Sequence, residues 1–197
     1  MYASSRLPIT LLVFGLPMLA GPAQGIRNFD QVDAHVYRGA QPTVEGFHYL
    51  AKLGVKTVID LREPGQRSMA EEREVSAMGM RYIGVPMTGL TPPTEDQIAK
   101  ILGVLEDQTS GPVFVHCMRG ADRTGAVIAA YHIEHDRWDN ARALRDAKAH
   151  GMSFFQLPRQ SYIRTFRART VAATAGPPAS ATKPATSAAV PATSPAN

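Results

Sequence analysis

The chain has 197 residues, of which 44% are hydrophobic and 19% charged, with a formal net charge of +4. These values are typical of a globular domain of ordinary size and exclude a chain that is disordered throughout. Basic residues are spread out without interleaved aromatic residues, so no nucleic-acid partner is predicted. The chain contains one cysteine, so no internal disulfide can form.

The first 25 residues have the pattern of an export signal. Arg6 supplies positive charge before an uncharged apolar run from Leu7 to Ala20, and small residues follow at Gly21 and Ala23. The run is short and interrupted by prolines, so we expect a cleaved signal peptide over 1–25 and no stable membrane span afterwards. The predicted location is the periplasm or the cell exterior. A membrane tether formed by an uncleaved N-terminus is the alternative.

Residues 26–170 are predicted to form one domain in which strands and helices alternate. Strand patterns cover 57–61, 82–85 and 112–115, and helical patterns cover 68–79, 98–105, 126–131, 139–149 and 159–169. Ser68 and Glu71 have the spacing of a capping box, which predicts a helix start at Ser68. The alternation predicts an α/β fold with a mainly parallel central sheet and helices on both faces.

The most informative stretch follows the predicted strand 112–115. It reads His-Cys-Met-Arg-Gly-Ala-Asp-Arg-Thr-Gly from His116 to Gly125 and contains the single cysteine, Cys117. Amides of a tight loop, a helix N-terminus and Arg123 would all stabilise a Cys117 thiolate, and all would bind a phosphoryl group. The stretch therefore predicts a sulfur nucleophile beside an oxyanion site, at the carboxyl end of a strand.

The pattern His-Cys-x5-Arg-Thr-Gly resembles the signature loop of the protein tyrosine phosphatase superfamily. Residues 36–42, Val-Tyr-Arg-Gly-Ala-Gln-Pro, resemble the N-terminal segment of small bacterial dual-specificity-like phosphatases, and the whole resemblance covers roughly 29–169. It implies that Cys117 attacks phosphorus and forms a phosphocysteine, while Arg123 and the loop amides bind the phosphoryl oxygens. No metal or other cofactor is implied.

The resemblance also assigns supporting roles. Thr124 would stabilise the thiolate when it leaves, and His116 would orient the loop from behind. The residues expected to bind substrate are Met118, Arg119, Gly120, Ala121 and Thr124. Arg38, in the N-terminal segment of the resemblance, is expected to anchor local structure rather than to contact substrate.

One expected part is missing, because the family usually supplies a general acid from a loop before the signature strand. The corresponding stretch, 85–93, has no carboxylate. Glu95 and Asp96 follow it, but Thr94 and Gln97 have capping-box spacing, which places these acids in the first turn of a helix. Asp122 lies inside the signature loop, so it is the preferred proton donor, with Asp96 and Glu95 as alternatives.

The leading hypothesis is an exported cysteine-dependent phosphatase that acts on phosphotyrosine, with phosphoserine and phosphothreonine as further candidates. Its partner would be a phosphorylated protein or a small phosphate ester. An inositol-phosphate or lipid-phosphate phosphatase is one alternative, although Asp122 opposes a highly anionic substrate. A phosphate-binding pseudophosphatase is the other. Residues 171–197 are rich in Ala, Pro, Thr and Ser and are expected to form a disordered tail. The sequence leaves the oligomeric state open.

Overall fold

A computed structural model describes residues 25–169. The expected tail, 171–197, and the expected signal peptide, apart from its last residue, lie outside the described residues. The described chain forms a five-stranded sheet in the order β1-β2-β5-β3-β4. The strands are β1 (Asp30–Gln31), β2 (Val36–Ala40), β3 (Thr57–Asp60), β4 (Arg81–Gly84) and β5 (Val113–Cys117). Strands β2, β5, β3 and β4 are parallel, and β1 pairs with β2 in the antiparallel direction.

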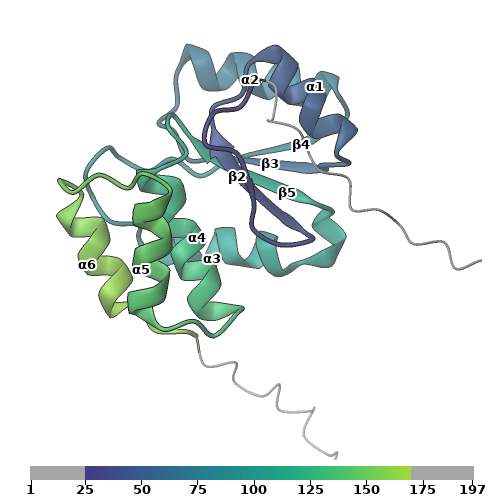
Figure 1. The fold of residues 1–197 in the computed structure, drawn as a ribbon. Helices are drawn as coiled ribbons and strands as arrows, with labels where there is room; N and C mark the ends of the chain where they lie inside the picture. The colour runs from purple at the N-terminus through teal and green to yellow at the C-terminus, as the bar shows by residue number, and fades with distance from the viewer. Residues whose placement is uncertain (1–24, 170–197) are drawn as a thin grey trace, which may run out of the picture.

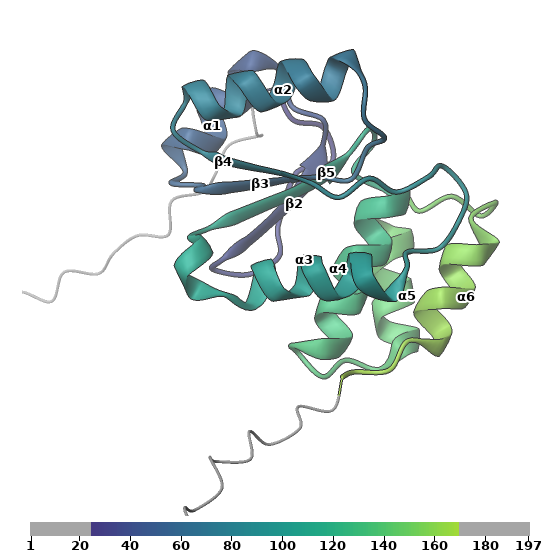
Figure 2. The same cartoon turned by 180° about the vertical axis from the view of Figure 1, so that it is seen from behind.

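Helices cover both faces of the sheet, which confirms the predicted fold class (Figures 1 and 2). One face carries α1 (Val44–Lys52) and α2 (Gln66–Ala77). The other carries α3 (Glu95–Glu106), α4 (Asp122–Glu134), α5 (Asn140–Ala149) and α6 (Leu157–Thr165). A 3-10 turn, η1 (Gln108–Ser110), leads into β5. No helix within residues 25–169 is long and apolar enough to cross a membrane.

The central strand β5 is buried along its whole length and sends alternate side chains to opposite layers. Val115 and Cys117 belong to the apolar cluster formed with α3 to α6. Phe114 belongs to the smaller cluster under α1 and α2, and His116 stacks on Phe114 with ring centroids 5.5 Å apart. The alternation therefore turns the Cys117 side chain toward α4 and the His116 side chain toward α2.

Two predicted helix boundaries are wrong. Helix α2 begins at Gln66 rather than Ser68, because the Ser68 hydroxyl accepts a hydrogen bond from the Gly65 backbone N–H at 2.8 Å and so occupies the third position of the helix. Helix α6 spans Leu157–Thr165 rather than 159–169. It ends there because Asn140 Nδ2 donates to the carbonyls of Ile163 and Phe166, each at 2.8 Å.

Candidate active site

The signature loop connects β5 to α4 and is held from its outer side. The Gly120 carbonyl accepts hydrogen bonds from Asn28 Nδ2 at 2.9 Å and from Arg38 Nη2 at 3.1 Å. Gly120 has a φ of +68°, and a Cβ at this position would lie 2.3 Å from the carbonyl carbon of Gly39. Glycine is therefore required for the loop to pack against β2. Arg38 anchors local structure here, in keeping with its expected role.

The Cys117 sulfur is the focus of the loop and is almost fully buried. Burial alone would raise its pKa, but hydrogen bonds from the Thr124 hydroxyl and from the backbone N–H groups of Thr124 and Arg119, together with the charge of Arg123, lower the pKa of Cys117 below its ordinary value. The Thr124 hydroxyl is itself buried, and its interaction with the sulfur is the largest of these influences. These donors favour the thiolate.

Arg123 lies in the first turn of α4, above the carboxyl edge of the sheet. Its Nη1 donates to the carbonyl of Leu61 at 3.4 Å and to the carbonyl of Met87 at 3.2 Å. Both carbonyls lie just beyond the ends of parallel strands. No described residue accepts a hydrogen bond from Nε or Nη2, so one edge of the guanidinium is left for two oxygens of a phosphoryl group.

A buried charged network lies behind the loop. His116 Nε2 is 2.6 Å from Glu71 Oε1, although this oxygen lies off the direction of the ring N–H, so the contact is electrostatic rather than a well-aligned hydrogen bond. The other Glu71 oxygen accepts from Arg62 Nη2 at 2.6 Å. Arg62 also donates to both oxygens of Asp60, at 2.8 and 2.7 Å. The network links the loop to α2 through His116.

Three members of this network could in principle hold a metal ion. Asp60, Glu71 and His116 offer ligand atoms within 4.8 Å of one another, and all three are buried. Arg62 already provides a positive charge that binds both carboxylates, and these hydrogen bonds, opposing the effect of burial, lower the pKa of Asp60. Arg62 therefore already places a positive charge between the two carboxylates.

Comparison with known proteins assigns the chain to a family. Residues 23–165 match the family described as "DSP-PTPase phosphatase fused to NAD+ Kinase". The chain belongs to this dual-specificity-type phosphatase family. The rice protein "Inositol diphosphatase DSP1" is 32% identical over 51% of this chain and 47% of its own length. "Dual specificity protein phosphatase TpbA" of Pseudomonas aeruginosa is 28% identical over 63% of this chain and 55% of its own length.

The chain therefore spans about half the length of these two curated relatives, and 11% of "Probable NAD kinase 2, chloroplastic" from rice. The crystal structure of P. aeruginosa TpbA in complex with pTyr shares the fold, with a TM-score of 0.61, 24% identity, and coverage of 70% of this chain and 83% of that one. The predicted superfamily is confirmed.

Asp122 connects the signature loop to the segment between α5 and α6. Its Oδ1 accepts a hydrogen bond from the Ser153 backbone N–H at 2.8 Å, and its Oδ2 lies 3.5 Å from Arg119 Nη2. Arg119 in turn donates to the Gly151 carbonyl at 3.2 Å. Asp122 thus lies beside the loop, as expected, and both of its oxygens have partners there.

The stretch 85–94, which lacks the expected acid, is tied to α6. Arg159 is fully buried and donates from Nη1 to the Gly89 carbonyl at 2.6 Å and from Nη2 to the Thr88 carbonyl. Gln156 Nε2 donates to the same Gly89 carbonyl at 3.3 Å. The backbone of this stretch therefore serves as an acceptor for arginine side chains.

Glu95 and Asp96 lie in the first turn of α3 and are exposed. The predicted capping box is present, because Thr94 Oγ1 accepts from the Gln97 N–H at 3.3 Å and Gln97 Oε1 accepts from the Thr94 N–H at 2.8 Å. Both acids therefore occupy the helix positions that the sequence predicted for them, where negative charge stabilises the helix dipole.

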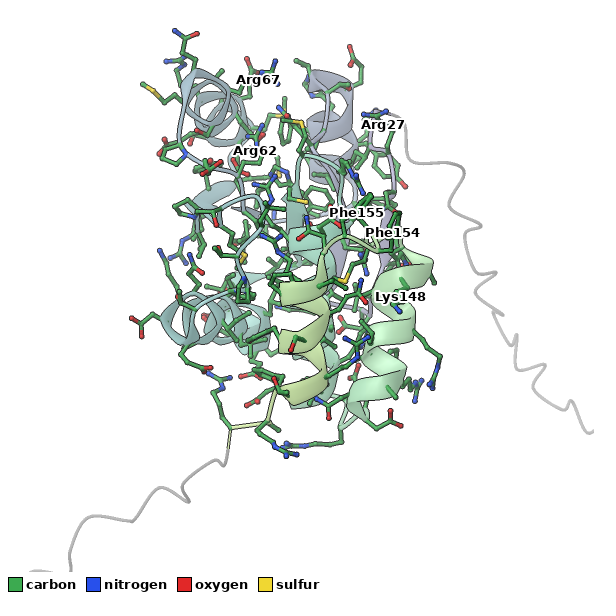
Figure 3. All side chains as sticks on the ribbon, turned by 90° about the vertical axis from the view of Figure 1, so that its left-hand side faces the viewer. Arg27, Arg62, Arg67, Lys148, Phe154 and Phe155 are labelled. Atoms are coloured by element: carbon green, nitrogen blue, oxygen red, sulfur yellow. The ribbon has the colours of Figure 1, made fainter. Side chains whose placement is uncertain are left out.

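Arg62 and Arg67 lie apart from Phe154 and Phe155 on the face of the molecule shown in Figure 3. Beside the signature loop is a cavity of about 450 Å³, lined by Met118 and Arg123 and, from the β3–α2 side, by Arg62 and Arg67. The α5–α6 segment instead carries Phe154 and Phe155, whose side chains are 72% and 71% exposed. One side is cationic and hollow, and the other is aromatic and projecting.

Sequence reasoning missed several of the residues that build this site. Arg62 and Arg159 look like ordinary surface arginines in the sequence, yet both are buried and hold loops of the site. Asn28 contacts a carbonyl 92 residues away. A buried arginine has no local sequence pattern, and the Arg62 partner Glu71 lies nine residues away on α2.

Proposed function

We propose that this phosphatase hydrolyses phosphotyrosine through a covalent phosphocysteine. The observation that carries the proposal is the Cys117 sulfur, whose pKa is lowered by donors from Thr124 and Arg119 and by Arg123. The thiolate attacks phosphorus, the P–O bond to the phenol breaks, and a P–S bond forms. Water then breaks the P–S bond, which releases phosphate and regenerates the thiolate.

The charge that develops on the phosphoryl oxygens is stabilised by fixed donors. The bidentate edge of Arg123 would bind two of them, and the amides of Met118, Arg119, Gly120 and Ala121 would bind the rest. Thr124 would donate to the sulfur as it leaves in the second step. Asp122 is our proposed proton donor to the phenolate, because it lies within the signature stretch, one residue before Arg123.

Two observations support phosphotyrosine as the substrate. The structure of TpbA that shares this fold contains pTyr, and the exposed rings of Phe154 and Phe155 follow Ser153, whose backbone N–H donates to Asp122. The cationic cavity supports a second candidate, an inositol phosphate, which is the substrate class in the name of the rice relative.

Hydrolysis by the full chain of a phosphotyrosine peptide, a phosphoserine peptide and inositol phosphates tests the proposal, with Cys117→Ser as the control. We expect the phosphotyrosine peptide to be hydrolysed fastest. Cys117→Ser should abolish turnover yet still bind vanadate, because the loop amides and Arg123 remain. Residual turnover above a few per cent in that variant would overturn the covalent route, and a faster rate on inositol phosphates would favour the second candidate.

Export is a further part of the proposal and rests on the sequence of residues 1–25, with its charged start, apolar run and small residues. In that case Cys117 would work in an oxidising compartment with no second cysteine to protect it by an internal disulfide. N-terminal sequencing of the protein recovered from a periplasmic fraction tests this; recovery with the N-terminus intact would favour the membrane-tethered alternative.

A further inference from the structure

Large apolar side chains are exposed together on two segments that lie side by side. Among the described residues, the four most exposed are Leu90 (68%), Phe154 (72%), Phe155 (71%) and Leu157 (65%). Leu90 belongs to the stretch before α3, and the other three belong to the entry into α6. The Gly89 carbonyl joins the two segments, because it accepts hydrogen bonds from Gln156 Nε2 at 3.3 Å and from Arg159 Nη1 at 2.6 Å. We call these four side chains the apolar patch.

Buried polar groups, rather than the patch, hold these segments in place. Arg159 and Gln160 are buried and donate to main-chain carbonyls, Arg159 to Gly89 and Gln160 Nε2 to Ser153 at 3.1 Å. The four apolar side chains therefore remain exposed although the backbone that carries them is fixed. A cluster of this kind on a folded domain marks a surface that is covered by a partner.

Exposed cations lie beside the patch. Figure 3 shows Phe154 and Phe155 between Arg27 and Lys148. Both cations are exposed, and neither forms an ion pair with a carboxylate of residues 25–169. Their charge is therefore available to an anionic partner.

The cationic region continues along α5. Lys148 also lines a cavity of about 420 Å³ with Arg145 and Arg164, and none of the residues that line it is an acid. No Asp or Glu follows Asp146 in the sequence. The α5–α6 side of the patch is therefore cationic over its whole length, and it would attract a surface of negative charge.

A bilayer with anionic headgroups fits this arrangement better than an acidic protein does. The apolar side chains project from two loops, so a protein partner would need a separate hollow for each of them. A bilayer admits projecting Phe and Leu side chains at the boundary of headgroups and acyl chains, and its headgroups attract Lys and Arg at the same level. Glu95 and Asp96 are exposed beyond Leu90, so the α5–α6 side would approach the headgroups most closely.

We propose that this domain docks on an anionic bilayer through the apolar patch, with Arg27 and Lys148 at the level of the headgroups. Ser153, next to Phe154, donates its backbone N–H to Asp122 of the signature stretch at 2.8 Å. Docking would therefore bring the signature loop to the membrane surface. This contact is separate from the phosphatase reaction and from any attachment through residues 1–25.

A fluorophore at the patch tests the proposal with the full chain. Cys117→Ser removes the single thiol, and Phe154→Cys then gives one site for an environment-sensitive nitrobenzoxadiazole label. We expect its emission to shift to the blue and intensify with vesicles of equal parts phosphatidylglycerol and phosphatidylcholine, but not with phosphatidylcholine alone. Because the label reports only its own surroundings, attachment through residues 1–25 would not by itself produce this change.

Lys52→Cys in the same background is the matched control for the label. Lys52 is exposed and ends α1, which runs from the carboxyl end of β2 to the amino end of β3, so it lies at the opposite edge of the sheet. A label there should show no change with either vesicle.

Two further substitutions, each added to the chain labelled at position 154, separate the apolar and cationic contributions. Phe155→Ser should raise the lipid concentration at half-maximal change about tenfold, by loss of one buried ring. Lys148→Gln should raise it about fivefold, as for one cation near an anionic surface. Lys52→Gln removes the same charge at the far edge and should leave it unchanged.

Unchanged emission at position 154 with the anionic vesicles would overturn the proposal and leave the patch to a protein partner. An equal change with phosphatidylcholine alone, or an equal change at position 52, would also overturn it. A blue shift that appears without vesicles as the protein concentration is raised would assign the patch to a second copy of the chain instead.

Discussion

Two segments meet at Arg123 and use their backbones in opposite ways. In the signature loop the Gly120 carbonyl is bound from outside by Asn28 and Arg38, while N–H groups of the loop are directed at the Cys117 sulfur. In the stretch before α3 the carbonyls of Met87, Thr88 and Gly89 accept hydrogen bonds from arginines. The first segment is therefore built to hold an anion, and the second to hold cations.

The difference explains how a stretch without a carboxylate can still serve the site. The Met87 carbonyl accepts from Arg123, and the Thr88 and Gly89 carbonyls accept from Arg159. Arg123 is thereby held at the edge of the sheet before any substrate is present. The segment contributes orientation of a cation through its main chain, a role that no side-chain motif would reveal.

The largest expected effect comes from the residue that the two segments share. Arg123→Lys keeps the charge but loses the planar fork that would reach two phosphoryl oxygens and the Met87 carbonyl together. We expect kcat/KM to fall by about two orders of magnitude, as when one preorganised donor to a transition state is lost. Steady-state rates on 4-nitrophenyl phosphate measure this, and a near-normal rate would contradict bidentate binding.

The stretch 85–94 has no carboxylate to act as general acid, so Asp122 is expected to donate the proton instead. Asp122→Asn should slow phenyl phosphate by about a hundredfold and 4-nitrophenyl phosphate far less, because only the poorer leaving group needs a proton. Asparagine can still accept the Ser153 N–H, so the loop should stay in place. The two kcat/KM values, measured side by side, give the comparison.

Asp96→Asn and Glu95→Gln are the matched controls, and both should leave the ratio of the two rates unchanged, because these residues are exposed on the first turn of α3. A leaving-group-dependent loss in one of them would assign the proton donor to that residue instead of Asp122.

The signature stretch could be predicted from the sequence, but the residues that support it could not. The strand–loop–helix of the signature stretch is local, so its glycines, cysteine and arginine could be placed from residue types, and the parallel sheet follows from the alternation of elements. The supports are not local. Arg159 bonds to a carbonyl 70 residues away, and Arg38 to one 82 residues away. Such contacts depend on the packed fold, and no periodicity of the sequence encodes them.

The smallest expected effect is on the pKa of the Cys117 thiol. Thr124→Val removes the hydroxyl that, after burial, has the largest influence on Cys117 and lowers its pKa. The pKa of Cys117 should therefore rise, and the fraction of thiolate should fall most at pH values between the midpoints of the native protein and the variant. Thr124→Ser keeps the hydroxyl and should behave like the native protein.

The rate of Cys117 alkylation by iodoacetamide as a function of pH measures this without contribution from substrate ionisation. We expect the midpoint of the Thr124→Val curve to lie at higher pH than that of the native protein, with slower alkylation below the two midpoints and similar rates well above them. The amides of Thr124 and Arg119 and the charge of Arg123 remain in the variant, so the shift should be partial. Coincident curves would mean that these three donors alone lower the pKa, and that the Thr124 hydroxyl only fills space beside the sulfur.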